Sequence, residues 1–127
     1  MNKKILIVDD EPDIVFLLKS RFEANGFTTI GASNGKEGIS KAVSEKPDLI
    51  LLDLLMPEKD GYETMRELKK NETTKDIPII LFTAAPPEKV VEKGDETVDA
   101  IDFVIKPFDD GALDTLLLKA KQLTKID

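Results

Sequence analysis

Residues 5–10 have the sequence ILIVDD, in which four aliphatic residues lead directly into two adjacent aspartates. The pattern returns at 49–53, where Asp53 ends an aliphatic run, and two later apolar runs are followed by Thr83 and Lys106. Short continuous runs of Ile, Leu and Val are typical of buried parallel strands. In an open parallel sheet, ligands bind outside the carboxyl ends of the strands. The sequence therefore predicts three carboxylates, a hydroxyl and an ammonium at one edge of a single sheet.

Strand and helix patterns alternate five times along the chain, which favours an α/β fold with a parallel sheet. The expected strands are those near 4–8, 28–32, 49–53, 79–83 and 101–105. Four of the expected helices have an apolar stripe at helical spacing. The stripes consist of Ile14, Leu17, Leu18 and Phe22; Ile39, Ala42 and Val43; Met65 and Leu68; and Leu113, Leu116, Leu117 and Ala120.

Turn and capping residues mark where these helices begin and end. Pro12 lies in the first turn of the first helix, which should end near residues 25–26. Asn34 with Glu37, and Asp60 with Glu63, have the spacing of a capping box. The last helix is expected from about residue 110.

The expected fourth helix, which should begin at residues 86–87, is the weak one. It contains Gly94 and offers little apolar surface. Residues 86–102 also hold six acids against two lysines, which is more typical of a solvated helix than of a buried one.

The composition is that of an ordinary globular domain. The chain has 127 residues, of which 41% are hydrophobic and 34% charged, and its net charge is −7. This length predicts one domain, residues 1–127. Because nucleic acids bind basic surfaces, the acidic balance argues against direct nucleic-acid binding. No apolar stretch reaches membrane-spanning length and no leader-like segment is present, so we expect a cytoplasmic location and no membrane contact.

The chain contains neither Cys nor His. Disulfides, a thiolate nucleophile, imidazole acid–base catalysis and an ordinary zinc site are therefore excluded. Any histidine in this protein's chemistry has to come from a partner.

Asp9, Asp10 and Asp53 form a candidate metal site. A single aspartate at a strand end usually starts a turn or caps a helix. Three crowded carboxylates, however, raise one another's pKa unless a cation is present. A hard divalent cation suits them, Mg²⁺ foremost, with Mn²⁺ as a substitute. Lys106 alone would be a strand-end lysine that reaches solvent, but beside three acids and Mg²⁺ it brings the site to neutrality.

Taken together, these residues resemble the response-regulator receiver domain of two-component signalling, and are similar to its chemotaxis-type regulators. The resemblance covers the whole chain and is carried by four segments in order. They are Ile7-Val8-Asp9-Asp10-Glu11, Leu52-Asp53-Leu54-Leu55-Met56-Pro57 with Asp60-Gly61, Phe82-Thr83-Ala84, and Lys106-Pro107-Phe108. The family implies a flavodoxin-like, doubly wound fold: a five-stranded parallel sheet in the order 2-1-3-4-5 with helices on both faces.

The resemblance also implies roles for the site residues. Asp53 is the phosphoacceptor, attacking a phosphohistidine of a sensor histidine kinase or phosphotransfer protein. Asp10, Asp53 and the backbone carbonyl of Leu55 bind Mg²⁺ directly, and Asp9 acts through bound water. Lys106 pairs with Asp53 and then with the phosphoryl group.

Thr83 and Phe103 are the implied switch residues. Thr83 is drawn toward the phosphoryl group, and Phe103 turns inward behind it. The surface of the fourth helix, fifth strand and fifth helix then signals to a downstream protein or output domain. The resemblance thus describes a signalling domain that promotes its own phosphotransfer, as a monomer or as a phosphorylation-dependent dimer, rather than an enzyme.

This chain departs from the family pattern at two places. Residues 98–102 replace a small Ala-Gly-Ala-type segment. Leu55 and Ala85, each two residues after a site residue, lack the polar groups that would position an attacking water. We therefore expect slow autodephosphorylation.

Three other classes of function remain open from the residues. A haloacid-dehalogenase-type phosphatase needs a second acid two residues after its nucleophile, where this chain has Leu55. A receiver-like module that never takes phosphate typically lacks an acid or the lysine, and this chain retains both. A flavodoxin-like cofactor site is disfavoured because the predicted crevice is acidic. Both a stand-alone regulator and a receiver cut from a longer regulator fit the sequence.

Overall fold

The structure, a computed structural model, describes residues 3–53, 61–83, 102–105 and 110–125. Strands and helices alternate along these residues, as the hydrophobic pattern predicts. Their bounds are β1 Lys4–Val8, α1 Pro12–Glu23, β2 Thr28–Ala32, α2 Gly35–Glu45, β3 Leu49–Asp53, α3 Gly61–Lys70, β4 Ile79–Thr83, β5 Asp102–Ile105 and α5 Asp110–Thr124. The expected fourth helix, near residues 86–98, lies outside the described residues.

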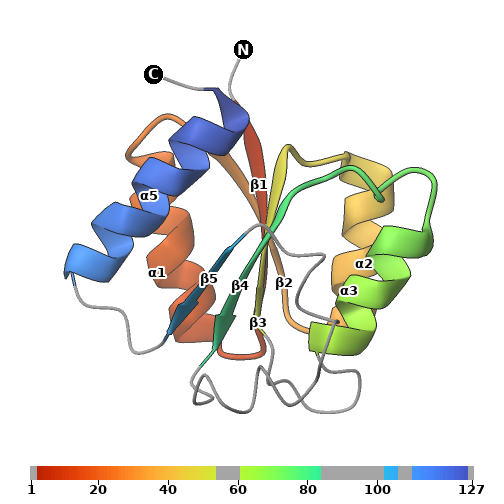
Figure 1. The fold of residues 1–127 in the computed structure, drawn as a ribbon. Helices are drawn as coiled ribbons and strands as arrows, with labels where there is room; N and C mark the ends of the chain where they lie inside the picture. Colours follow the sequence, from red (N-terminus) through yellow and green to blue (C-terminus); the bar gives the residue numbers. More distant parts are fainter. Residues whose placement is uncertain (1–2, 54–60, 84–101, 106–109, 126–127) are drawn as a thin grey trace.

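All pairs of neighbouring strands are parallel, and the order across the sheet is β2-β1-β3-β4-β5. The predicted α/β fold with a parallel sheet in the order 2-1-3-4 is confirmed. In the described residues, β5 extends this sheet by pairing with β4, Thr83 lying opposite Ile105. Because every strand runs in the same direction, the carboxyl ends of all of them meet at the edge away from the chain termini (Figure 1).

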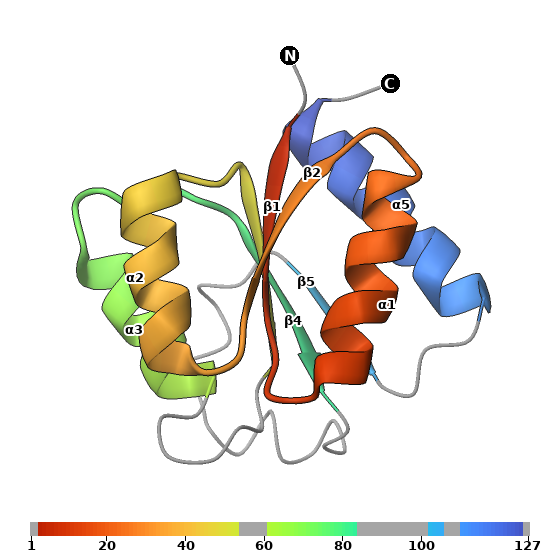
Figure 2. The ribbon, with the colours of Figure 1, turned by 180° about the vertical axis from the view of Figure 1, so that it is seen from behind.

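Two hydrophobic layers enclose the sheet, with α1 and α5 on one face and α2 and α3 on the other (Figures 1 and 2). Alternate strand residues point to opposite faces, so Ile5 and Ile7 pack toward Leu18 and Phe22 of α1. Leu6 and Val8 pack toward Met65 and the rest of the α2–α3 layer. The predicted stripes face the sheet: most of their members are buried, and Ile14, Leu17 and Ile39 are partly buried against the same clusters.

Of the two hydrogen bonds of the capping box predicted at α2, one is confirmed and the other has a different partner. The Asn34 side chain accepts a hydrogen bond from the Glu37 N–H at 2.8 Å, as an N-cap should. Glu37, however, reaches back to the N–H of Ser33, also at 2.8 Å, rather than to that of Asn34. The reciprocal bond therefore ties the helix start to the residue that follows β2. The cap predicted at Asp60 lies outside the described residues.

Within the ranges that the structure covers, none of the helices combines the length and apolarity needed to cross a membrane.

Gly38, one turn into α2, lies against β1 without room for a side chain. A Cβ at this residue would lie 2.9 and 3.0 Å from the two methyl carbons of Val8. The close approach of α2 to the sheet therefore depends on a missing side chain.

We predict that Gly38→Ala lowers the free energy of unfolding by about 1 kcal/mol, measured by urea denaturation. Overpacking costs about 1–3 kcal/mol, of which the better helix propensity of Ala returns up to about 1 kcal/mol. In a Val8→Ala background the same substitution should cost nothing, because the methyl groups are gone. Gly111→Ala, at an exposed position of α5, is the matched control and should not destabilise. If Gly38→Ala lowers the free energy of unfolding equally in the wild type and in Val8→Ala, the clash with the Val8 methyl groups is not the cause.

Candidate functional site

The register of the central strands sets Asp9 beside Asp53. Val8 of β1 lies opposite Leu52 of β3, so the next residue on each strand is an aspartate. Asp53 is the last residue of β3, and Asp9 directly follows β1 while its N–H donates to the Ala32 carbonyl of β2 at 3.0 Å. Both residues are almost completely buried, at 1% and 2% exposure. Two carboxyl groups therefore lie side by side at a buried edge of the sheet.

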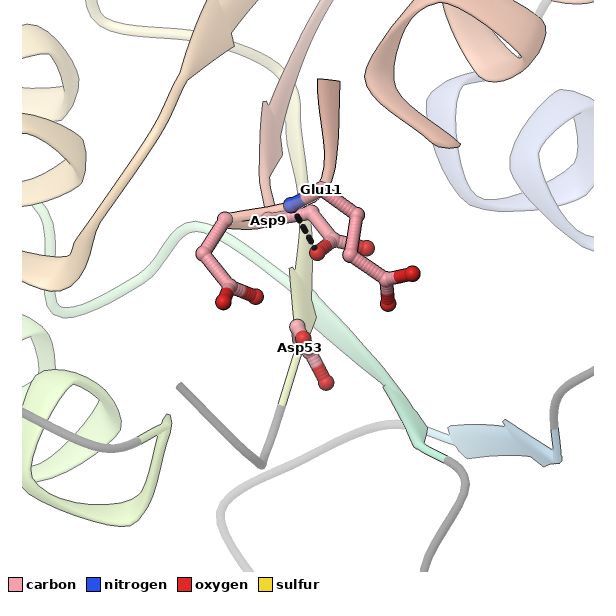
Figure 3. Close-up of side chains that lie close together, drawn as sticks. Asp9, Glu11 and Asp53 are labelled. Carbon is pink, nitrogen blue, oxygen red and sulfur yellow. Dashed lines mark hydrogen bonds between the residues drawn. The ribbon is translucent and has the colours of Figure 1, made fainter. Parts of the chain in front are cut away.

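The turn after β1 is held by Asp9 itself. One oxygen of its carboxylate, Oδ1, accepts a hydrogen bond from the Glu11 N–H at 2.9 Å, the geometry of an Asx turn. Pro12 then begins α1, where its missing N–H costs nothing. Figure 3 shows this hydrogen bond, with Asp9 and Glu11 above Asp53 at the end of β3. Asp9 thus has a structural role in addition to its place in the site.

Four carboxylates gather at this edge: Asp9, Asp10, Glu11 and Asp53. One ligand oxygen from each lies within 4.8 Å of those of the other three. Asp9 and Asp53 form the buried floor, Asp10 is half-buried and Glu11 is exposed. The structure thus brings together the three predicted aspartates. It also adds Glu11, to which the sequence reasoning assigned no ligand role although it follows the aspartate pair directly.

Burial raises the pKa of Asp10 above its usual value of 3.8, and a hydrogen bond with Asp9 raises it further. The negative charges of Asp9 and Glu11 act in the same direction, against the opposite effect of a backbone hydrogen bond. The cluster therefore holds a carboxyl group that resists ionisation, chiefly because of burial and to a lesser extent because other acids lie close by.

The size of the cluster suits a small divalent cation. Mg²⁺ binds oxygen at about 2.0–2.1 Å, so two oxygens on opposite sides of the ion lie about 4 Å apart. The four carboxylate oxygens, all within 4.8 Å of one another, are close to this spacing. The donor set consists only of oxygen atoms, which hard cations prefer. The residues present therefore fit Mg²⁺ in both chemistry and dimensions.

The other predicted site residues lie on neighbouring strands or outside the described ranges. Thr83 ends β4, one residue beyond Phe82, which pairs with Asp53. Phe103 lies in β5 opposite Leu81. Leu55 and Lys106 lie outside the described residues, as do the side-chain positions of Thr83 and Phe103.

Comparison with known proteins places this geometry in a family. The sequence profile of the response regulator receiver domain matches residues 5–118, which include all the candidate site residues and, of the described strands, all but the first residue of β1. The match therefore covers the edge at which the carboxylates gather.

Two relatives show how far the similarity extends. The alkaline phosphatase synthesis transcriptional regulatory protein PhoP of Bacillus subtilis is 44% identical over 85% of this chain, which spans only 44% of PhoP. The protein PilH of Pseudomonas aeruginosa is 36% identical, with 87% of this chain and 90% of PilH aligned. The chain therefore spans less than half the length of PhoP but nearly all of PilH.

A solved structure of a response regulator has the same fold as this chain. The response regulator protein TrrA from Thermotoga maritima, crystallised in complex with Mg²⁺ and BeF, superposes with a TM-score of 0.82 at 37% identity. The superposition covers 95% of this chain and 98% of TrrA. Sequence profile, full-length relative and fold agree, and the chain belongs to the response regulator receiver domain family.

Proposed function

We propose that this chain is a phosphorylation switch of two-component signalling in which Asp53 accepts a phosphoryl group. The donor is a phosphohistidine of a sensor histidine kinase or phosphotransfer protein, since the chain itself has no histidine. The position of Asp53 carries the proposal: it is buried at the end of a central strand, opposite Asp9, within a cluster of four carboxylates. An aspartate that served only to start a turn would gain nothing from three further acids.

The sheet gives Asp53 the alignment that a nucleophile needs. β3 pairs on one side with β1 and on the other with β4, so the carboxylate extends from a rigid strand. In the proposed transfer, an Asp53 oxygen forms a bond to phosphorus as the phosphorus–nitrogen bond of the phosphohistidine breaks, and the imidazole keeps the electron pair. Phosphoryl transfer depends mainly on alignment and charge neutralisation. Positioning Asp53 is therefore the main contribution of the fold.

Asp9, Asp10 and Asp53 are proposed to hold Mg²⁺, with Mn²⁺ as a substitute. Asp10 and Asp53 bind it directly, together with the backbone carbonyl of Leu55. Asp9 already accepts the Glu11 N–H through Oδ1, so we assign it to act through a bound water. When bound, the cation neutralises charge on the transferring phosphoryl group. The complex of the similar TrrA with Mg²⁺ and BeF supports this proposal.

Thr83, Phe103 and Lys106 are proposed to respond to phosphorylation. Transfer replaces a single negative charge with about two, which attracts donors at the same edge of the sheet. The register supports the assignment, because Asp53 pairs with Phe82 and Thr83 pairs with Ile105. Thr83 thus follows the residue that pairs with Asp53, and Ile105, which pairs with Thr83, directly precedes Lys106 in the sequence. When Thr83 moves toward the phosphoryl group, the aromatic ring of Phe103 is proposed to turn inward behind it.

The output is proposed to be read on the surface formed by β5, α5 and the expected helix near residues 86–98. PhoP, by its name a transcriptional regulatory protein, is more than twice as long as the segment aligned with this chain. The partner is therefore either an output domain or a separate downstream protein, and the receiver itself is not expected to bind nucleic acid. A cytoplasmic location, and a monomer or phosphorylation-dependent dimer, complete the proposal.

We predict that incubation with Mg²⁺ and acetyl phosphate adds the mass of one phosphoryl group to the wild-type chain and none to Asp53→Asn. Intact-mass spectrometry measures the gain. Asp76→Asn, at an exposed position away from the site, should behave as the wild type. A gain in Asp53→Asn, or none in the wild type, would contradict the assignment.

After the donor is removed, the phosphoryl group should persist for minutes or longer, because the side chains of Leu55 and Ala85 have no polar group that could position a water. Loss of the group within seconds would refute slow autodephosphorylation.

We also predict that the affinity for Mg²⁺ rises with pH up to the raised pKa of Asp10 and levels off above that pKa. A protonated Asp10 cannot bind the cation, so Mg²⁺ has to displace its proton, and affinity is lost as the pH falls. Calorimetric titration in two buffers of different ionisation enthalpy measures both the affinity and the proton release.

The matched variant is Asp10→Asn, which keeps the shape of the side chain and cannot titrate. It should bind Mg²⁺ at least about tenfold more weakly, since even outer-shell changes cost that much, with a smaller dependence on pH. An affinity that does not change with pH over this range in the wild type would overturn the prediction.

A further inference from the structure

β2 is an edge strand with one side unpaired by any described strand. It pairs with β1 only, at one end of the sheet, and lies between α1 and α2 (Figure 2). The Thr28 N–H donates to the Lys3 carbonyl, and the Ala32 carbonyl accepts from the Asp9 N–H. Because neighbouring residues of a parallel strand direct their backbone groups to opposite sides, Thr29 and Gly31 direct theirs away from β1.

Two lysines bind these outward carbonyls. Lys41 of α2 donates from Nζ to the Gly31 carbonyl at 2.6 Å. Lys19 of α1 donates from Nζ to the Thr29 carbonyl at 3.3 Å. The two helices lie on opposite faces of the sheet, so the ammonium groups reach the same strand edge from both sides. Both side chains are only about a third exposed.

Each lysine is held in place by a glutamate on its own helix. Lys19 lies 3.8 Å from Glu23, which also accepts a hydrogen bond from the Thr29 hydroxyl. Lys41 lies 3.7 Å from Glu37, the residue that binds the Ser33 N–H just beyond β2. On each side, lysine, glutamate and strand therefore form one connected group. Each ammonium group is therefore held by both a carboxylate and a backbone carbonyl.

The surface beside this edge would otherwise favour an added strand. A hollow of about 520 Å³ lies beside it. Its lining includes Val15, Phe16, Gly31, Ala32 and both lysines, and also Asp9 and Asp10 of the acidic cluster. Phe16 is 73% exposed. Unpaired backbone groups next to apolar surface are a template on which another chain can pair.

We propose that Lys19 and Lys41 form a two-sided cap that closes the β2 edge and prevents a second copy of this chain from adding a strand to it. A strand that paired with Thr29 and Gly31 would have to displace both ammonium groups from their carbonyls and glutamates. It keeps the domain from associating through the open edge of β2.

The test compares Lys19→Met/Lys41→Met with Lys36→Met/Lys70→Met by sedimentation velocity over a concentration series. The control removes two exposed lysines, so both proteins carry the same net charge. We expect the cap variant to associate at concentrations at least about tenfold lower than the control or the wild type, since its edge is open to pairing. If it stays as monomeric as the control while folded, the proposal is wrong.

Two further measurements locate the contact. Lys19→Arg/Lys41→Arg retains donors that can reach the carbonyls and should remain monomeric. In the associated cap variant, the Thr29 and Gly31 amides should gain protection from hydrogen exchange; association without that protection would place the contact elsewhere and overturn the proposal. If the double variant does not fold, Lys41→Met alone, at the shorter contact, is measured in the same way against Lys36→Met.

Discussion

The pairing of Val8 with Leu52 is the constraint on which the site depends. It places the residue after each strand, Asp9 and Asp53, next to each other at a buried edge. A shift of one residue in either strand would separate the two carboxylates and turn every core side chain of that strand to the opposite face. The hydrophobic layers that stabilise the fold therefore also maintain the acidic cluster.

Placing four carboxylates close together lowers the free energy of unfolding. Burial and neighbouring charges raise the pKa of Asp10. For an acid, a raised pKa in the folded state means that stability falls as the pH rises from 3.8 through that raised value, because the unfolded chain releases its proton first. A cation that binds only the folded state offsets this loss. The cluster is therefore unfavourable for folding alone, and this cost is consistent with the proposed binding of a divalent cation.

Sequence patterns predicted the parts of this structure that follow from short-range chemistry. The apolar runs 5–8 and 49–52 became central strands, and the N-cap at Asn34 formed as expected. A capping box would pair the Glu37 side chain with the Asn34 N–H, but Glu37 accepts from the Ser33 N–H instead. The path of the chain between β2 and α2 decides which N–H group the side chain reaches. No ligand role was predicted for Glu11, because its place in the cluster depends on the turn after β1 and not on a strand end. The lysines at the β2 edge were not predictable, since their carbonyl partners are ten residues away and depend on how the helices pack.

The central claim is that the carboxylates at the sheet edge repel one another and that a divalent cation relieves the repulsion. The most direct test is the free energy of unfolding of the wild type and of Asp53→Asn, each with and without Mg²⁺. Without Mg²⁺, Asp53→Asn should be more stable than the wild type, because the substitution removes one carboxylate from the crowded cluster. At a hundred times its Kd, Mg²⁺ should stabilise the wild type by about 2.7 kcal/mol and the variant by much less. A variant less stable than the wild type without Mg²⁺, or equal stabilisation of both, would contradict the account.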